Sequence, residues 1–133
     1  MYESQGKYSE AESLYQRSLE IIEKKLGKDH PSVASSLNKF GDLYNTLGKY
    51  EEAEPLYQRS LRIRETKLGK DHPSVAITLN NLAALYESQG KYAEAESLYQ
   101  RSLEIIEKKL GKDHPYYKTA MENFLMLLEK SQK

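Results

Sequence analysis

Apolar and small residues recur along the chain at intervals of three and four positions, which is the spacing of one face of an α-helix. Over residues 8–26 this face consists of Tyr8, Ala11, Tyr15, Ser18, Leu19, Ile22 and Leu26. The same spacing returns over residues 31–47, 50–68, 73–89, 92–110 and 115–130. The pattern predicts an all-α protein built from these segments.

The segments are separated by residues that end and start helices. The first is followed by Gly27 and then by Lys-Asp-His-Pro, and Pro31 opens the next. Glycine suits a left-handed C-terminal cap, and proline at the first helical position loses no hydrogen bond. Either Asp29 or His30 is placed to cap the helix that begins at Pro31.

Two of the segments are near copies of each other. The stretch GKYSEAESLYQRSLEIIEKKLGKDHP, from Gly6 to Pro31, returns from Gly90 to Pro115 with only Ser9 changed, to Ala93. A looser copy begins at Gly48, so the three glycines are 42 residues apart. A pair of helices this small cannot bury its apolar face alone, and stacked copies form a continuous core. The period therefore predicts an α-solenoid.

The stretch LNNLAALYESQGKYAEAESLYQRSL, from Leu79 to Leu103, resembles a tetratricopeptide repeat. Leu79 stands where that family often has tryptophan, and its other signature positions match Leu82, Ala83, Tyr86, Gly90, Tyr92, Ala95, Tyr99 and Ser102. The usual period is about 34 residues, and the longer one here is similar to kinesin light chains and to arrays in bacterial signalling proteins. The resemblance covers residues 1–133 as one domain and implies a right-handed superhelix of antiparallel helix pairs.

The register of the repeats predicts incomplete ends. Tyr2 matches Tyr44 and Tyr86, so residues 1–5 are expected to be a stub of a first helix. The segment 115–130 departs from the repeat, since Leu125 and Leu128 replace a small residue and a tyrosine. Both ends leave apolar surface uncovered, which predicts association between copies of the chain.

In tetratricopeptide arrays the first helix of each pair lines a concave groove that binds peptides, and the resemblance implies the same here. The residues at these positions are Ser35, Asn38, Lys39, Asp42, Asn45, Ile77, Asn80, Asn81, Ala84, Glu87, Thr119, Glu122, Asn123 and Met126. An asparagine amide both donates and accepts, so it can pair with a peptide backbone of any sequence. The alternative is that these amides bond to neighbouring helices. Arrays that clamp a carboxylate use several basic groove residues, and only Lys39 fits that pattern.

Composition excludes several other functions. Lys plus Arg and Asp plus Glu number 20 each, which argues against binding nucleic acid or an anionic membrane. There is no cysteine, and no apolar run approaches the roughly 18 residues of a membrane span. We therefore expect a cytoplasmic protein.

Candidate chemistry is equally sparse. His30, His72 and His114 occur once per repeat before a proline, which favours capping over metal binding. Most tyrosines recur at repeat positions, which favours packing over base stacking. No nucleophile–base pair or phosphate loop is present, so no enzyme activity, cofactor or metal is expected. The sequence predicts a non-catalytic scaffold that binds a protein or peptide. A structural spacer or self-association segment of a larger multidomain signalling protein is the alternative.

Overall fold

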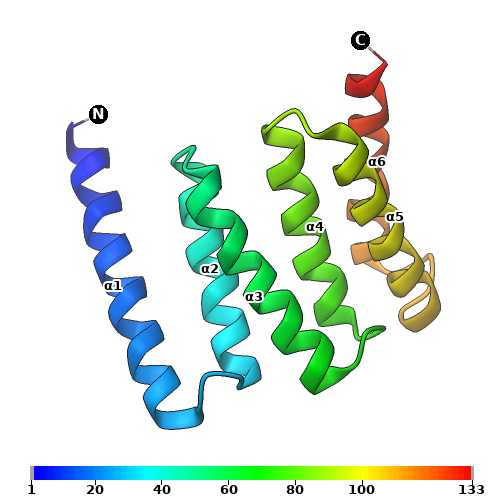
Figure 1. The fold of residues 1–133 in the computed structure, drawn as a ribbon. Coiled ribbons are helices and arrows are strands. Elements are labelled where there is room, and N and C mark those ends of the chain that lie inside the picture. The colour runs from blue at the N-terminus through cyan, green and yellow to red at the C-terminus, as the bar shows by residue number, and fades with distance from the viewer. Residues whose placement is uncertain (1, 133) are drawn as a thin grey trace. The chain divides into compact units, whose positions relative to one another are not determined.

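The computed structural model describes residues 2–132, with side chains from Lys7 onward. It contains α1 (Tyr2–Leu26), α2 (Pro31–Thr46), α3 (Tyr50–Leu68), α4 (Pro73–Ser88), α5 (Tyr92–Lys109) and α6 (Pro115–Ser131), as Figure 1 shows. Within residues 2–132 there is no β-strand. The starts and ends of α2 to α6 lie within one residue of those expected from the sequence. Below, α2, α4 and α6 are called the A-type helices, and α1, α3 and α5 the B-type helices.

The start of α1 differs from the expectation. A short stub and a break at Gly6 were predicted, yet one helix runs from Tyr2 to Leu26. At the matching Gly48 and Gly90 the chain does turn, with φ of 77° and 79°. Those turns close a full preceding helix, which packs back on the next one. In the described part of the chain no such helix precedes Gly6, so a turn there would lose helical hydrogen bonds without gaining packing. Glycine inside a helix costs only about 1 kcal/mol. The helix therefore continues through Gly6.

The chain divides into two compact units, residues 1–63 and 64–133. The first contains α1, α2 and α3 as far as Ile63, and the second contains the end of α3 with α4, α5 and α6. Each unit has its own buried cluster.

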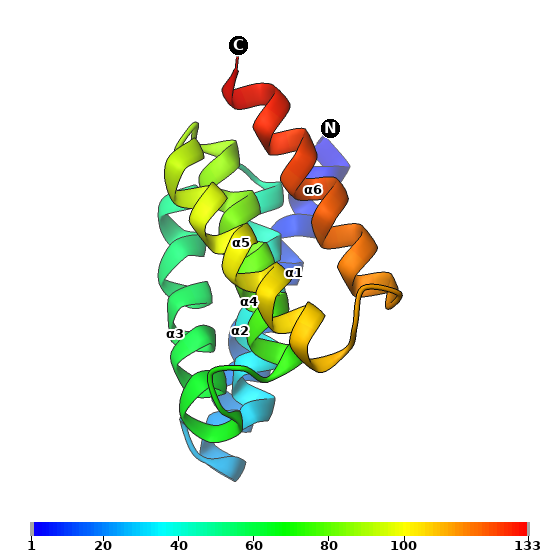
Figure 2. The same cartoon turned by 90° about the vertical axis from the view of Figure 1, so that its right-hand side faces the viewer.

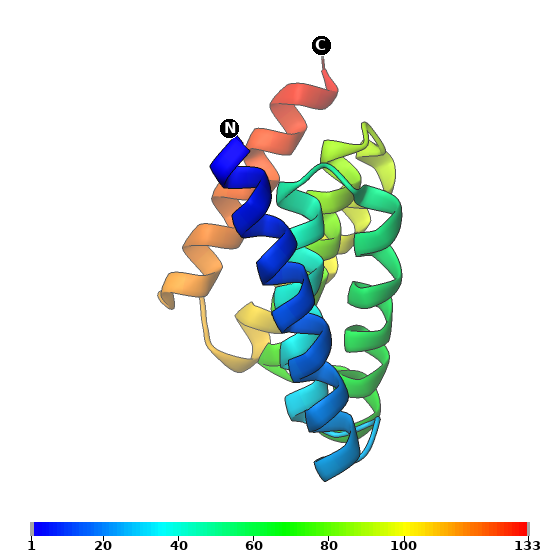
Figure 3. The same ribbon diagram turned by 90° about the vertical axis from the view of Figure 1, so that its left-hand side faces the viewer.

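In the first unit α1 and α3 both pack on α2. Val33, Ala34 and Leu37 of α2 form a buried cluster with Ile63 of α3, and Leu19, Ile22 and Leu56 pack against it. On the α1 side the rings of Tyr15, Phe40 and Tyr44 stack, with centroids 6.0 and 4.9 Å apart. Figure 3 shows α1 lying beside α2. Burial of these apolar side chains is the main stabilising term, at about 25 cal/mol per Å².

In the second unit α5 packs between α4 and α6 (Figure 2). Ala83, Ala95, Tyr99 and Leu127 form its buried cluster. Ser102 Oγ donates to the carbonyl oxygen of Ala76 at 3.1 Å, and Ser60 makes the same bond to Ala34 at 3.0 Å in the first unit. The small residues of the A-type helices therefore let a B-type helix approach the backbone closely.

Histidine is the residue that caps each A-type helix. The backbone N–H groups of Ser32, Ser74 and Tyr116 donate to Nδ1 of His30, His72 and His114 at 3.0, 3.0 and 3.1 Å. A proline follows each histidine at the first helical position. The structure thus confirms the predicted capping role and selects His30 over Asp29.

Candidate functional site

The predicted groove residues lie on three helices, and their exposure varies. On α2, Ser35, Lys39 and Asp42 are exposed and Asn45 is half-buried. Asn38 is only 5% exposed and is engaged in an interaction within the protein. In this structure its side chain offers almost no surface to a ligand, so Asn38 serves packing instead.

In the second unit, α4 and α6 together carry the remaining predicted residues. Exposed positions are Ile77, Thr119, Glu122 and Met126, and half-buried positions are Asn80, Asn81, Ala84, Glu87 and Asn123. We call Ile77, Asn80, Asn81, Ala84, Thr119, Glu122, Asn123 and Met126 the A-helix surface. It mixes apolar contacts, such as the 56% exposed Met126, with side-chain amides. That mixture suits a peptide with an apolar side chain and an accessible backbone.

A carboxylate joins α4 to both α5 and α6 at the edge of the A-helix surface. Glu87 Oε2 accepts a hydrogen bond from Lys130 Nζ of α6 at 2.6 Å, and Glu87 Oε1 accepts one from the Tyr99 hydroxyl of α5 at 3.3 Å. The bond to Glu87 raises the pKa of Lys130 above its ordinary value. Sequence reasoning assigned Glu87 to the ligand and did not identify Lys130, because only the crossing of α4 and α6 brings them together.

Asp42 of α2 has the corresponding role in the first unit. The Tyr57 hydroxyl of α3 donates to Asp42 Oδ1. Partial desolvation raises the pKa of Asp42, while the bond from Tyr57 lowers it, and desolvation dominates. Desolvation and the carboxylate together raise the pKa of Tyr57. Asp42 and Glu87 therefore tie a B-type tyrosine to an A-type helix.

One amide oxygen of the A-helix surface lacks a partner. Asn80 Oδ1 is buried and accepts no hydrogen bond from any group in the described part of the chain. A buried acceptor left unpaired costs about 1–3 kcal/mol. An N–H donor supplied from outside would remove this cost, and the backbone of a bound peptide carries such donors.

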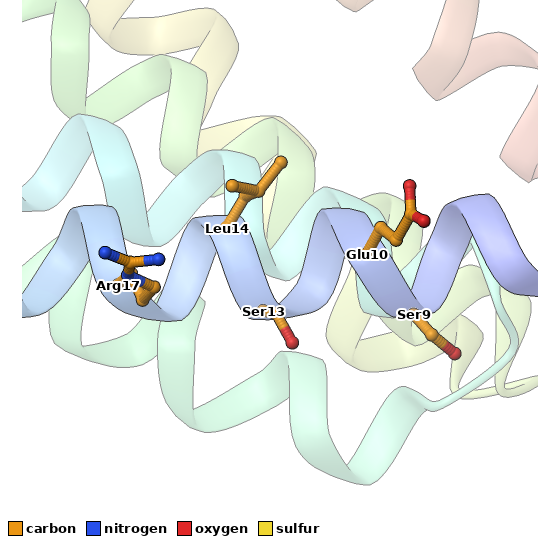
Figure 4. A pocket seen from close by; sticks show the side chains of 5 residues that line it. All are labelled: Ser9, Glu10, Ser13, Leu14 and Arg17. Carbon is orange, nitrogen blue, oxygen red and sulfur yellow. The ribbon is translucent and has the colours of Figure 1, made fainter.

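The B-type helices carry surface depressions that sequence reasoning missed. One on α1 is lined by Ser9, Glu10, Ser13, Leu14 and Arg17 (Figure 4). Another is lined by Glu54, Pro55, Gln58 and Arg62 of α3. None of the predicted groove residues contributes to them. The sequence did contain a sign of the depression on α1, because the repeat register leaves this helix without a full preceding helix to cover it.

Other site types find no support among residues 7–132. No cluster of three or more His, Asp or Glu side chains is arranged to hold a metal ion there. The described helices are all too short or too polar to cross a membrane.

Comparison with known proteins identifies the repeat. The tetratricopeptide repeat family model matches residues 1–66, 40–107 and 74–133. No curated protein sequence matches the chain at a significant level.

Two solved structures resemble it closely. BtubC (BKLC) from P. vanneervenii has a TM-score of 0.86 at 24% identity, over 98% of this chain and 52% of that one. A Podosopora anserina protein, described as a kinesin light chain with nearly identical TPR-like repeats, has a TM-score of 0.81 at 27% identity, over 95% of this chain and 60% of that one. The chain thus spans between half and two thirds of the length of these proteins, and the predicted all-α solenoid class is confirmed.

Proposed function

Because the chain belongs to the tetratricopeptide repeat family, we propose that it is a non-catalytic scaffold that binds a peptide or protein segment on its A-type helices. Tetratricopeptide repeats generally mediate protein–protein interactions, and proteins of this type are generally not enzymes. The specific proposal concerns the A-helix surface of the second unit, where Asn80, Asn81 and Asn123 hold the ligand's backbone.

The unpaired Asn80 oxygen carries this proposal. Its neighbours on the same helix face, Ile77 and Ala84, are apolar and accessible in part. Asn80 Oδ1 is buried in the free protein, so the half-buried amide must rotate outward before a ligand N–H can reach it. The bond then satisfies an acceptor whose desolvation cost the free protein already bears. The exposed Ile77 and Met126 then supply apolar contact on α4 and α6.

Charge limits the kind of ligand. Glu87 is paired with Lys130, so it presents little free negative charge, and Glu122 remains an exposed acid on α6. The A-helix surface carries no Lys or Arg, so a terminal carboxylate would find no cationic partner there. We therefore propose a peptide bound through its backbone and an apolar side chain. Ser35, Lys39, Asp42 and Asn45 of α2, in the first unit, remain predicted ligand contacts.

Peptide-library selection tests the proposal. The wild-type chain is compared with an Asn80→Ala/Asn81→Ala variant and with Gln100→Ala, a control on the exposed side of α5. We expect the double variant to bind the selected peptides at least about tenfold more weakly, a loss of roughly 1.4 kcal/mol. The control should bind like the wild type. Equal binding by all three proteins would refute the assignment.

A further inference from the structure

The outer face of α1 is apolar and uncovered. Leu14 and Ile21 are 65% and 57% exposed, and Ser18 beside them is exposed as well. In α5, which has the same sequence here, the matching Ile105 and Ser102 are 4% and 0% exposed. The difference arises because α4 covers this face of α5. Figure 4 shows Leu14 and Arg17 projecting from α1 at the depression.

The contacts that α5 makes with α4, with α3 and with the turn between them indicate what the matching face of α1 can bind. Besides the bond from Ser102 to Ala76, the Tyr99 hydroxyl donates to Glu87. Arg101 pairs with Glu65 at 2.5 Å, and Lys108 pairs with Asp71 at 3.1 Å. The corresponding donors on α1 are Tyr15, Ser18, Arg17 and Lys24. A surface that fits α1 therefore offers three carboxylates and a helix backbone in the same arrangement.

The C-terminal end of the same chain offers these acceptors. One period after Glu65, Asp71 and Glu87 the sequence has Glu107, Asp113 and Glu129, all exposed. Among the described residues Glu107 has only an ion pair with Lys112 at 3.5 Å, in which both side chains are more than half exposed. Arg17 has no ion pair with any side chain described, although the matching Arg59 and Arg101 both have one. The donors on α1 are thus complementary to acceptors on α5, on α6 and in the turn between them.

We propose that the chain associates head to tail, with α1 of one copy docking on α6 of the next in the manner of α5 on α4. The contacts across the interface are Arg17 to Glu107, Tyr15 to Glu129 and Lys24 to Asp113, with Leu14 and Ile21 against the apolar side of α6. The two surfaces differ, so each added copy leaves the same free ends, and association continues beyond a dimer. This interface does not involve the A-helix surface and stands apart from the proposed function.

One residue weakens the fit. Where α2 has Gly41 and α4 has Ala83, α6 has Leu125, which is 53% exposed. Gly41 lies so close to the Tyr57 ring that an added Cβ would be 2.8 Å from Cε1. The larger Leu125 side chain prevents Tyr15 of the next copy from packing as closely on α6 as Tyr57 packs on Gly41 and Tyr99 on Ala83. Association is therefore reversible and occurs at high concentration, in the range of about 100 µM, as for a small interface.

Sedimentation velocity from about 5 to 500 µM tests the proposal. We expect the mean sedimentation coefficient to rise with concentration and to pass the value of a dimer. Leu125→Ala should lower the concentration at half-association by at least about threefold, because removing the side chain opens the tyrosine site. Association driven only by exposed apolar surface predicts the opposite, since this variant removes an exposed leucine.

Charge reversal identifies the contact. Arg17→Glu should raise the midpoint concentration by about tenfold, and Arg17→Glu/Glu107→Arg should return it toward the wild-type value. Arg62→Glu, on an exposed part of α3, is the control and should leave the midpoint unchanged. Circular dichroism checks that each variant is folded. The proposal is overturned if the wild type and Leu125→Ala are both monomeric at about 500 µM. It is also overturned if Leu125→Ala associates more weakly than the wild type, or if the double variant does not restore association.

Discussion

The ring of Tyr57 on α3 lies directly against Gly41 of α2, with 2.8 Å between Tyr57 Cε1 and the position that a Cβ on Gly41 would occupy. The contact sets how closely a B-type helix approaches its A-type partner. Alanine adds a methyl group that displaces the ring, yet it also favours the helix by about 1 kcal/mol over glycine. Ala83 below Tyr99 shows that the repeat accommodates this methyl group.

We therefore predict a small loss of stability for Gly41→Ala, within about 1 kcal/mol, and a loss of about 3 kcal/mol for Gly41→Leu, because a leucine overfills the space below the ring. Urea denaturation followed by circular dichroism measures both. If Gly41→Leu were as stable as the wild type, the tyrosine contact would not determine the spacing of the helices.

A buried arginine of α3 donates hydrogen bonds to a threonine and to a backbone carbonyl of α4. Arg64 Nη1 donates to Thr78 Oγ1 at 2.9 Å and to the Ser74 carbonyl oxygen at 3.0 Å, and burial lowers the pKa of Arg64. In the next repeat the same two positions hold Ile106 and Ala120, both buried. The chain thus contains a polar and an apolar version of one contact.

Thr78→Ala alone should cost about 1–3 kcal/mol, because it removes the acceptor of a buried guanidinium N–H. The double change Arg64→Ile/Thr78→Ala should be within about 1 kcal/mol of the wild type, because it recreates the apolar pair. A double-mutant cycle by urea denaturation checks this. Additive losses from the two single changes would show that the contact is not coupled.

The histidine caps provide a second test of stability. His72→Ala removes the acceptor for the Ser74 N–H and should destabilise the protein by about 1 kcal/mol. His72→Asn should retain most of the stability, since an asparagine oxygen can accept the same bond. Thermal unfolding of the three proteins makes the comparison. Equal losses for alanine and asparagine would mean that the imidazole acts through packing.

Alkaline pH should weaken the first unit through Tyr44. Its hydroxyl donates to Glu12 Oε1 at 2.7 Å, and desolvation together with this carboxylate raises the pKa of Tyr44 to about 12. A raised pKa means that the folded state holds the proton more tightly than the unfolded state does. The resulting stability is complete below pH 10 and is lost as the pH rises from 10 to 12.

The free energy of unfolding should therefore fall over this range more steeply in the wild type than in Tyr44→Phe, whose value at pH 8 supplies the baseline. Identical pH slopes for the two proteins would contradict the assignment.

Much of the fold was predictable because its determinants are local. Glycine at each turn, histidine and proline at the start of each A-type helix, and the spacing of the alanines act within a few residues of the sequence. The continuous α1 was not predicted, because the break at Gly48 or Gly90 depends on packing by a full preceding helix. A local motif alone does not produce that turn.

The candidate site was less predictable, since exposure depends on how helices cross. Asn38 and Asn80 occupy the same position of the repeat, yet Asn38 is buried and engaged whereas Asn80 is half-buried with an unpaired oxygen. Glu87, a predicted ligand contact, bonds to Tyr99 and Lys130. Sequence position predicts a helix face, and side-chain packing decides which residues on it remain accessible.

The most direct test of the proposed scaffold function is to follow side-chain amide resonances while a selected peptide is titrated into the ¹⁵N-labelled chain. Asparagines on α4 and α6 mark the A-helix surface, and Gln16 and Gln100 on α1 and α5 are exposed controls. We predict that the resonances of Asn80, Asn81 and Asn123 shift with one common affinity while those of Gln16 and Gln100 stay in place. Shifts at the two glutamines with unchanged asparagines would place the ligand on the B-type helices and contradict the proposal.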